Sequence, residues 1–173
     1  MKRLRHSFLA RAAMTLLLVV LCTAGLQAKV YTGFTKKGGT DGFTNEGPEK
    51  FVDGNRNSKW CVSKSPTVSN PIYIEFESNV AFVPTGYILT TGNDTETSPG
   101  RNPKNWILKG KVNSDDTWTD IVTVSDDNTL GATNNTPYQF AINGVATAYK
   151  YFRFEVTALT SGNIFQLSDL YSL

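Results

Sequence analysis

In the segment Phe152-Arg153-Phe154-Glu155-Val156, large apolar residues alternate with charged ones. Successive side chains of a β-strand point to opposite faces, so this pattern predicts a strand with one face in a core and the other in solvent. The segments Ile72–Glu77 and Tyr138–Ile142 repeat the pattern. Further strands are predicted where β-branched and aromatic residues are frequent, at Tyr87–Thr91, Trp106–Val112, Trp118–Val124 and Ile164–Tyr171.

Turn-forming sequences such as Ser98-Pro99-Gly100 and Asn143-Gly144 separate the predicted strands. Helical periodicity is missing after residue 28, apart from one turn at Pro48–Val52. The segment Lys36–Gly47 is glycine-rich and polar, and we predict that it is a loop. About eight short strands with regularly spaced turns predict an all-β protein, either an antiparallel two-sheet β-sandwich or a barrel.

Residues 1–28 have the features of a secretory signal peptide. A basic start precedes an apolar run at Ala12–Leu26, and the small residue Ala28 suits cleavage directly after it. We therefore expect a secreted protein, extracellular or at the cell surface, or in the periplasm if the source is bacterial. The apolar run is shorter than the about 20 residues that a membrane-spanning helix needs. Lipidation at Cys22 is an alternative that the bulky Leu21 before it disfavours.

The length of residues 29–173 suits one domain with one core. Four of the 17 Lys and Arg residues and none of the 15 Asp and Glu residues precede residue 29, which leaves 13 basic and 15 acidic residues. The resulting net charge is 13 − 15 = −2. A negative net charge does not support a nucleic-acid-binding surface. The one histidine, His6, is also outside this domain, and Cys61 is its one cysteine. A Ser-His or Cys-His catalytic pair, a typical zinc site and an internal disulfide are therefore excluded from it.

Oxygen-bearing side chains are dense in the segment Glu49–Cys61 (EKFVDGNRNSKWC). Asp53-Gly54-Asn55 is a turn sequence in which the glycine supplies backbone freedom. This density of oxygen ligands suits a calcium loop, because calcium binds carboxylate, amide and hydroxyl oxygens. Taken alone, the same sequence is more commonly an ordinary surface turn. The oxygen-bearing side chains are Asp53, Asn55, Asn57 and Ser58.

Three groups of segments, taken in order, carry a resemblance to a known family. They are Glu49–Cys61; Gly92–Asp94 with Gly100–Gly110 and Trp118; and Tyr151–Phe154 with Phe165–Leu170. In this order they resemble the discoidin domains, also called coagulation factor V/VIII type C domains, and the similar family-32 carbohydrate-binding modules. The resemblance covers residues 47–173 and implies a galactose-binding-like jelly roll, a two-sheet antiparallel β-sandwich. Residues 29–46 then form an N-terminal strand and loop segment of the same domain.

In the family that the chain resembles, the acidic turn holds a structural calcium ion. Carried over to this sequence, the resemblance implies a metal site in which Asp169 stands where the family more often has glutamate, so its carboxylate reaches less far. A site that joins the turn to a residue near the end of the chain closes nearly the whole domain and removes entropy from the unfolded chain. The implied calcium ligands are Asp53, Asn55, Ser58 and Asp169.

The resemblance also implies a non-catalytic module that binds a carbohydrate, such as a cell-surface glycan, through loops at one end of the sandwich. Amide and guanidinium groups can recognise the hydroxyls of a sugar. The segment Thr157–Asn163 has no aromatic residue, which weakens the sugar hypothesis. The same lack weakens a lipid-binding hypothesis, because the membrane-binding type C domains rely on protruding apolar loop residues, so membrane insertion is not expected. The polar residues predicted to bind the ligand are Arg56, Asn57, Asn93, Asp94, Arg101 and Asn163.

Two other functions are compatible with the sequence. One is a protein-interaction or adhesion domain of the same fold, whose partner is an extracellular protein. The other is a small glycosidase that uses two carboxylates, although no pair of acidic residues stands out.

Asn93 and Asn134 begin glycosylation sequons, which a eukaryotic secretory pathway would modify. A glycan on Asn93 would argue against ligand contact there.

The three tryptophans after residue 28 suit either sugar stacking or core packing. Trp60, Trp106 and Trp118 each lie in or beside a predicted strand, and the matching residues of the family mostly pack in the core. We therefore predict that all three are core residues. Cys61 follows Trp60 directly and is predicted to be a buried, inert thiol.

The sequence Arg101-Asn102-Pro103-Lys104 invites an anion-binding interpretation because it brings two cations together. The alternative is that Arg101 braces the loop from Gly92 to Pro103 by bonding to backbone carbonyls or to Asp94. The family often has Arg-Asp-Pro at this place for such bracing, so the resemblance favours the second interpretation.

Overall fold

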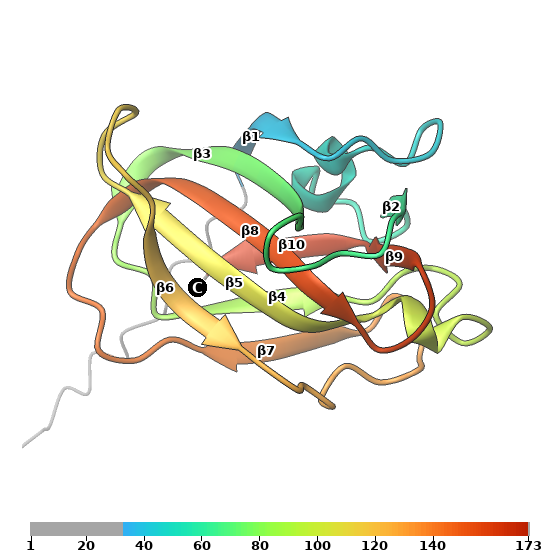
Figure 1. Cartoon of the computed structure of the whole chain (residues 1–173). Helices are drawn as coiled ribbons and strands as arrows, with labels where there is room; N and C mark the ends of the chain where they lie inside the picture. Colours follow the sequence, from blue (N-terminus) through green and yellow to red (C-terminus); the bar gives the residue numbers. More distant parts are fainter. Residues whose placement is uncertain (1–32, 173) are drawn as a thin grey trace, which may run out of the picture.

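The computed structural model describes residues 33–172, which form ten β-strands and two short 3-10 helices (Figure 1). The predicted signal peptide, residues 1–28, lies outside the described residues, and so does Cys22. Within residues 33–172, no helix has the length and apolar character needed to cross a membrane.

One layer of the fold is an antiparallel sheet of five strands in the order β1-β3-β8-β5-β6. The central strand β8 pairs with β3, so that Ile74 lies opposite Phe154 and Phe76 opposite Phe152. The strands of this sheet are β1 (Phe34–Gly39), β3 (Ile72–Phe82), β5 (Pro103–Lys111), β6 (Thr119–Val124) and β8 (Tyr149–Leu159).

The other layer consists of two smaller antiparallel sheets, β10-β4-β7 and β2-β9 (Figure 1). Only Ser168 separates β9 from β10, and its N–H donates to the carbonyl of Thr90 at 2.8 Å. This hydrogen bond connects the two small sheets, because Ser168 directly follows β9 and Thr90 is the last residue of β4. The strands are β2 (Trp60–Ser63), β4 (Gly86–Thr90), β7 (Pro137–Ala141), β9 (Ile164–Leu167) and β10 (Asp169–Ser172).

The core follows the predicted alternation along the strands. Phe154 of β8 is fully buried, and its ring centroid lies 5.1 Å from that of Phe51 and 6.4 Å from that of Trp106. Phe51 belongs to the short helix Pro48–Val52, which confirms the single helical turn predicted there. The all-β antiparallel sandwich is thereby confirmed, with aromatic side chains from both layers at its centre.

Three details of the strands differ from the sequence-based expectations. β1 includes residues 36–39, which were predicted to be loop, because their backbone pairs with β3 despite their low strand propensity. β2 follows the acidic turn without a strong sequence signal. The predicted strand Ile164–Tyr171 is divided at Ser168, where the chain leaves β2 and joins β4.

Two of the three tryptophan predictions are confirmed: Trp60 and Trp106 are fully buried in the core. The Trp106 indole N–H also donates to the hydroxyl of Tyr87 at 2.8 Å. Cys61 is buried as predicted, and it is a free cysteine. Burial, helped by the negative charge of Glu46, raises the pKa of its thiol to about 11, so the reactive thiolate is disfavoured.

The prediction that Trp118 packs in the core is wrong. Each step along β5 moves the opposite position in β6 by one residue, except between Leu108 and Lys109, where it moves by two. Ile121 is the extra residue, and such a β-bulge turns the residues beyond it to the other face of the sheet. Trp118 is therefore half-buried on the outer surface, with its ring centroid 4.6 Å from Nζ of Lys111.

Replacing Phe154 with alanine should lower the free energy of unfolding by about 3–5 kcal/mol, because it opens a cavity where both layers meet. The measurement is urea denaturation followed by tryptophan fluorescence. Val68→Ala is the matched control: Val68 is 82% exposed, and its truncation should change the stability by less than about 0.5 kcal/mol. Equal effects of the two changes would contradict the position of the core.

Candidate functional site

Four segments meet at one end of the sandwich, which we call the loop end: residues 53–59, 92–102, 130–136 and 160–163. Backbone hydrogen bonds tie the last three together, and side-chain hydrogen bonds from Lys59 to Asp94 and from Asn93 to Asn57 attach the first. The N–H of Asn135 donates to the carbonyl of Gly92 at 3.2 Å, and the N–H of Thr160 donates to the carbonyl of Asn102 at 2.9 Å. The loops therefore form one connected surface.

Asp94 is the electrostatic centre of the loop end. Its Oδ2 accepts hydrogen bonds from Nζ of Lys59 at 2.8 Å and from Nη1 of Arg101 at 2.9 Å. Burial opposes the ionisation of Asp94, but the two cations outweigh it and hold the pKa of Asp94 below its ordinary value. Glu46 lies 3.6 Å from Nζ of Lys59 and extends the network.

Gln166, in the protein interior, is hydrogen-bonded to the same network. It is fully buried, its Oε1 accepts from Nη1 of Arg101 at 3.4 Å, and its Nε2 donates to Oγ1 of Thr95 at 3.2 Å. A side chain at Gly92 would place its Cβ 2.8 Å from Gln166, so the close approach requires glycine. Arg101 is held on two sides, which confirms that it braces the loop through Asp94.

The loop end is hollowed beside Arg101. This loop-end hollow has a volume of about 380 Å³ and is lined by residues 97–101 and 161–164, with Arg101 and Asn163 among them. Its two walls approach closely, because a Cβ at Gly100 would lie 2.1 Å from Oγ of Ser161. The guanidinium uses Nη1 for Asp94 and Gln166, while the side chain of Asn163 is exposed.

The other predicted ligand residues lie at different distances from this hollow. Asn93 and Asn57 meet each other, since Nδ2 of Asn93 donates to the carbonyl of Asn57 at 3.4 Å. Arg56 is turned away and lies over the ring of Tyr171, 5.7 Å from its centroid. The structure thus brings Asp94, Arg101 and Asn163 together, and the contact between Asn93 and Asn57 joins the loop of Asp94 to residues 53–59.

Lys104 does not join Arg101. Its ammonium lies 2.7 Å from Oδ1 of Asp126, in a pair whose lysine side chain is 42% and aspartate side chain 80% exposed. The two cations of the sequence Arg101-Asn102-Pro103-Lys104 therefore have separate carboxylate partners, and this pairing disfavours a shared anion site.

The predicted calcium loop is closed by its own side chains. Oγ of Ser58 donates to Oδ2 of Asp53 at 2.9 Å, and the N–H of Asn55 donates to Oδ1 of Asp53 at 2.9 Å. Gly54 has a φ of 72°, the left-handed conformation that the sequence Asp-Gly-Asn predicts. Three of the four predicted ligands therefore lie within one turn.

Asp169, the fourth predicted ligand, comes to this turn from the start of β10. Its side chain is fully buried, and Oδ1 accepts the N–H of Leu170 at 2.9 Å. Oδ2 has no hydrogen-bond partner among the described residues. Burial and the nearby charge of Asp53 raise the pKa of Asp169 to about 6, against the opposing effect of polar hydrogens on Tyr171, Leu170 and Gly54.

Two features of this site were not predicted. Lys59 and Gln166 were absent from the predicted ligand set, although both touch its residues. Gln166 does carry a sequence signal: it stands within the apolar run of β9, where a buried amide must find partners. Lys59 carries none, because its partner Asp94 lies 35 residues away.

Known proteins show which family the chain belongs to. Residues 35–169 match the family model of the F5/8 type C domain. The chain belongs to the F5/8 type C domain family. The resemblance expected from the sequence is thereby confirmed for nearly all of the described residues. A search of curated protein sequences found no match to this domain.

Solved structures show the same fold. The F5/8 type C domain of a Bacteroides fragilis protein superposes with a TM-score of 0.65 at 16% identity, over 82% of this chain and 91% of that chain. The family 32 carbohydrate-binding module of Streptococcus pneumoniae EndoD gives 0.64 at 13%, over 84% and 99%. The family 32 module of Clostridium perfringens NanJ, solved in complex with galactose, gives 0.59 at 13%, over 83% and 98%.

Replacing Asp94 with asparagine should lower the free energy of unfolding by about 1–2 kcal/mol at pH 7, because it removes a charged acceptor from two cations. The lowered pKa of Asp94 sets the sign of the pH dependence. The stabilisation by Asp94 is complete at pH values above 3.8, the pKa of this carboxyl group in the unfolded chain. It is lost as the pH falls through the lower pKa that the group has in the folded protein. Wild type and Asp94→Asn should therefore converge in acid, whereas the exposed control Asp41→Asn should match wild type throughout.

Proposed function

We propose that this F5/8 type C domain is an extracellular, non-catalytic module that binds carbohydrate in the loop-end hollow. The observation that carries the proposal is the pairing of a fixed guanidinium with an exposed amide on the two walls of that hollow. Membership of a family with carbohydrate-binding structural neighbours supports the same ligand class.

The chemistry of the loop-end hollow suits hydroxyl groups. Arg101 presents planar N–H donors, and Asn163 presents both a donor and an acceptor. Because Asp94 and Gln166 already fix Arg101, binding costs little side-chain entropy. Hydrogen bonds, rather than stacking on a ring, therefore provide recognition at this end.

A binding role also agrees with the ionised state of Asp94, the carboxylate that bonds Arg101. Asp94 is adjacent to the loop-end hollow, and its Oδ2 is shared between two cations, which keep it ionised. A glycosidase needs one carboxyl group that holds a proton and can donate it. Asp94 is therefore placed to position Arg101, not to transfer a proton.

The test is binding to a glycan array, followed by calorimetry with each retained glycan and with galactose. Asn163→Ala should weaken binding about tenfold, the cost of one lost polar contact. Asn143→Ala changes another exposed turn asparagine, distant in the sequence, and should leave the affinity unchanged. Silence across the array, together with capture of an extracellular protein in a pull-down, would overturn carbohydrate binding in favour of adhesion.

We also propose that a structural calcium ion is held between the acidic turn and β10. The residues fit such an ion, because the buried Oδ2 of Asp169 has no hydrogen-bond partner within residues 33–172 and a second carboxylate, Asp53, is near enough to raise the pKa of Asp169. Asn55 and Ser58 add neutral oxygens, as calcium accepts. No group of three or more His, Cys, Asp or Glu side chains gathers anywhere in residues 33–172, so these neutral oxygens would complete the coordination.

Removal of divalent ions with a chelator should therefore lower the melting temperature. At a calcium concentration a hundred times the dissociation constant, the ion would add about 2.7 kcal/mol of stability. Asp169→Asn should abolish the difference between calcium and chelator, while Asp41→Asn should keep it. A melting curve of the wild-type protein that is identical with and without chelator would contradict the calcium site.

A further inference from the structure

A second hollow lies on the outer face of the five-stranded sheet, and we call it the sheet-face hollow. Its volume of about 310 Å³ is at the lower end of the range for small-molecule sites. It lies at the Lys111 end of β5, roughly 26 Å from the loop end at Pro103, given a rise of about 3.3 Å per residue. Its lining includes Lys37, Glu75, Glu77, Lys111, Trp118 and Tyr151.

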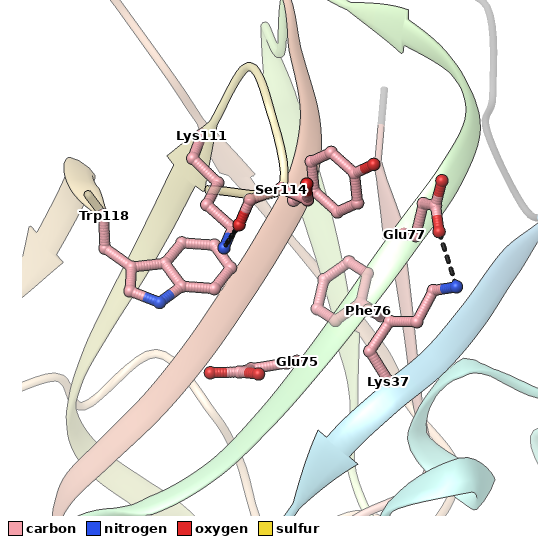
Figure 2. A pocket seen from close by; sticks show the side chains of 8 residues that line it. Lys37, Glu75, Phe76, Glu77, Lys111, Ser114 and Trp118 are labelled. Carbon is pink, nitrogen blue, oxygen red and sulfur yellow. Dashed lines mark hydrogen bonds and ion pairs between the residues drawn. The ribbon is translucent and has the colours of Figure 1, made fainter. Parts of the chain in front are cut away.

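The floor of the sheet-face hollow is a row of side chains in register across three strands. Glu77 of β3 lies opposite Tyr151 of β8, which in turn lies opposite Lys111 of β5. Opposite residues of antiparallel strands share one face, so the three side chains stand together on the outer surface. Glu75 extends from the next row, and Figure 2 shows it projecting into the space below Trp118 and Lys111.

Bulges in both edge strands supply the walls. In β1, Lys36 lies opposite Phe76 and Gly38 opposite Glu75, so Lys37 is an extra residue. The bulge in β6 likewise turns Trp118 outward. Bulges often re-aim a side chain beside a functional site. Here the bulge in β6 directs an indole to the hollow, and Lys37 at the bulge in β1 reaches the hollow from the opposite edge of the sheet.

The acidic side chains of the sheet-face hollow are neutralised, but one of its cations is not. Lys111 has no carboxylate within ion-pair distance among the described residues, and its ammonium donates to the carbonyl of Ser114 (Figure 2). Among the charged residues that line the hollow, Lys111 is therefore the one without an ion-pair partner of opposite charge within residues 33–172, while Arg153 is shared between Glu75 and Glu155. The neutralising ion pairs are Glu77 with Lys37 at 2.6 Å and with Lys150 at 2.8 Å, and Glu75 with Arg153 at 2.7 Å.

This unpaired ammonium lies close to two aromatic rings. Nζ of Lys111 lies 4.6 Å from the ring centroid of Trp118 and 5.7 Å from that of Tyr151. Both aromatic residues are only half-buried. The cation–π contacts hold the ammonium in place without neutralising it. The partly exposed outer surface of the sheet therefore presents the ammonium of Lys111 next to the apolar surfaces of two rings.

We infer that the sheet-face hollow is a second saccharide site, which binds a pyranose unit that carries a carboxylate, as in a uronic acid. The ring surfaces of Trp118 and Tyr151 match the apolar C–H face of a pyranose. The ammonium of Lys111 pairs with the sugar carboxylate in a charge-assisted hydrogen bond. Glu75 remains able to accept a sugar hydroxyl through the lone pairs that Arg153 leaves free. This site provides the aromatic surface that the loop-end hollow lacks.

The test is calorimetric titration of the purified protein with trigalacturonate, and with neutral galactotriose for comparison. Trigalacturonate should bind at least tenfold more tightly than the neutral trimer, and the difference should shrink as salt screens the charges. Trp118→Ala and Lys111→Gln should each weaken trigalacturonate binding at least tenfold. Trp118→Phe and Lys111→Arg, which keep a ring and a charge, should retain most of the affinity.

Two control variants separate this site from the rest of the protein. Lys104→Gln removes a surface cation elsewhere, and Asn163→Ala changes the loop-end hollow; both should leave trigalacturonate binding unchanged. Absence of trigalacturonate binding, or equal binding of the neutral trimer, would overturn the inference. So would binding that persists in folded Trp118→Ala and Lys111→Gln, or binding that is lost in Asn163→Ala. The last outcome would instead support the loop-end proposal, so the two proposals can fail separately.

Discussion

The ladder between β3 and β8 sets the constraint on which the other features depend. Its period of two sends Phe76 and Phe154 inward and Glu77 and Arg153 outward from the same two strands. Burial of the inward rings stabilises the sandwich, and the outward charges are forced into ion pairs across the sheet. Core and outer surface are thus two products of one backbone register, and a slip of one residue would destroy both.

Buried polar groups hold the side chains of the loop end in place through hydrogen bonds. Gln166 is fully buried yet has partners on both sides, in Arg101 and Thr95. Asp94 joins two segments that are 35 residues apart by bonding Lys59. Such a network is costly if any member is missing, because each group left alone in the interior loses its hydrogen bonds to water. The same interactions that complete the fold therefore set the geometry in which a ligand is recognised.

Local pattern was sufficient for the core strands, because alternation is a property of neighbouring residues. It was sufficient for the acidic turn as well, where Asp53 and Gly54 act within a few positions. It failed for Trp118, since the bulge at Ile121 is visible only when β6 is paired with β5. It also missed Lys59, whose role depends on contact with a distant loop. The features that could not be predicted depend on pairing between strands and on contacts between distant loops. Patterns among neighbouring residues do not reveal either.

The bulges have a consequence for solubility as well as for shape. β1 and β6 are the two outermost strands of the five-stranded sheet, and each contains one extra residue. A regular edge strand is a template on which another molecule can add a strand, and an irregular edge bearing lysine resists such addition. Lys37 stands at one of these irregularities. The outer strands of this sheet are thereby protected against edge-to-edge aggregation in a crowded medium.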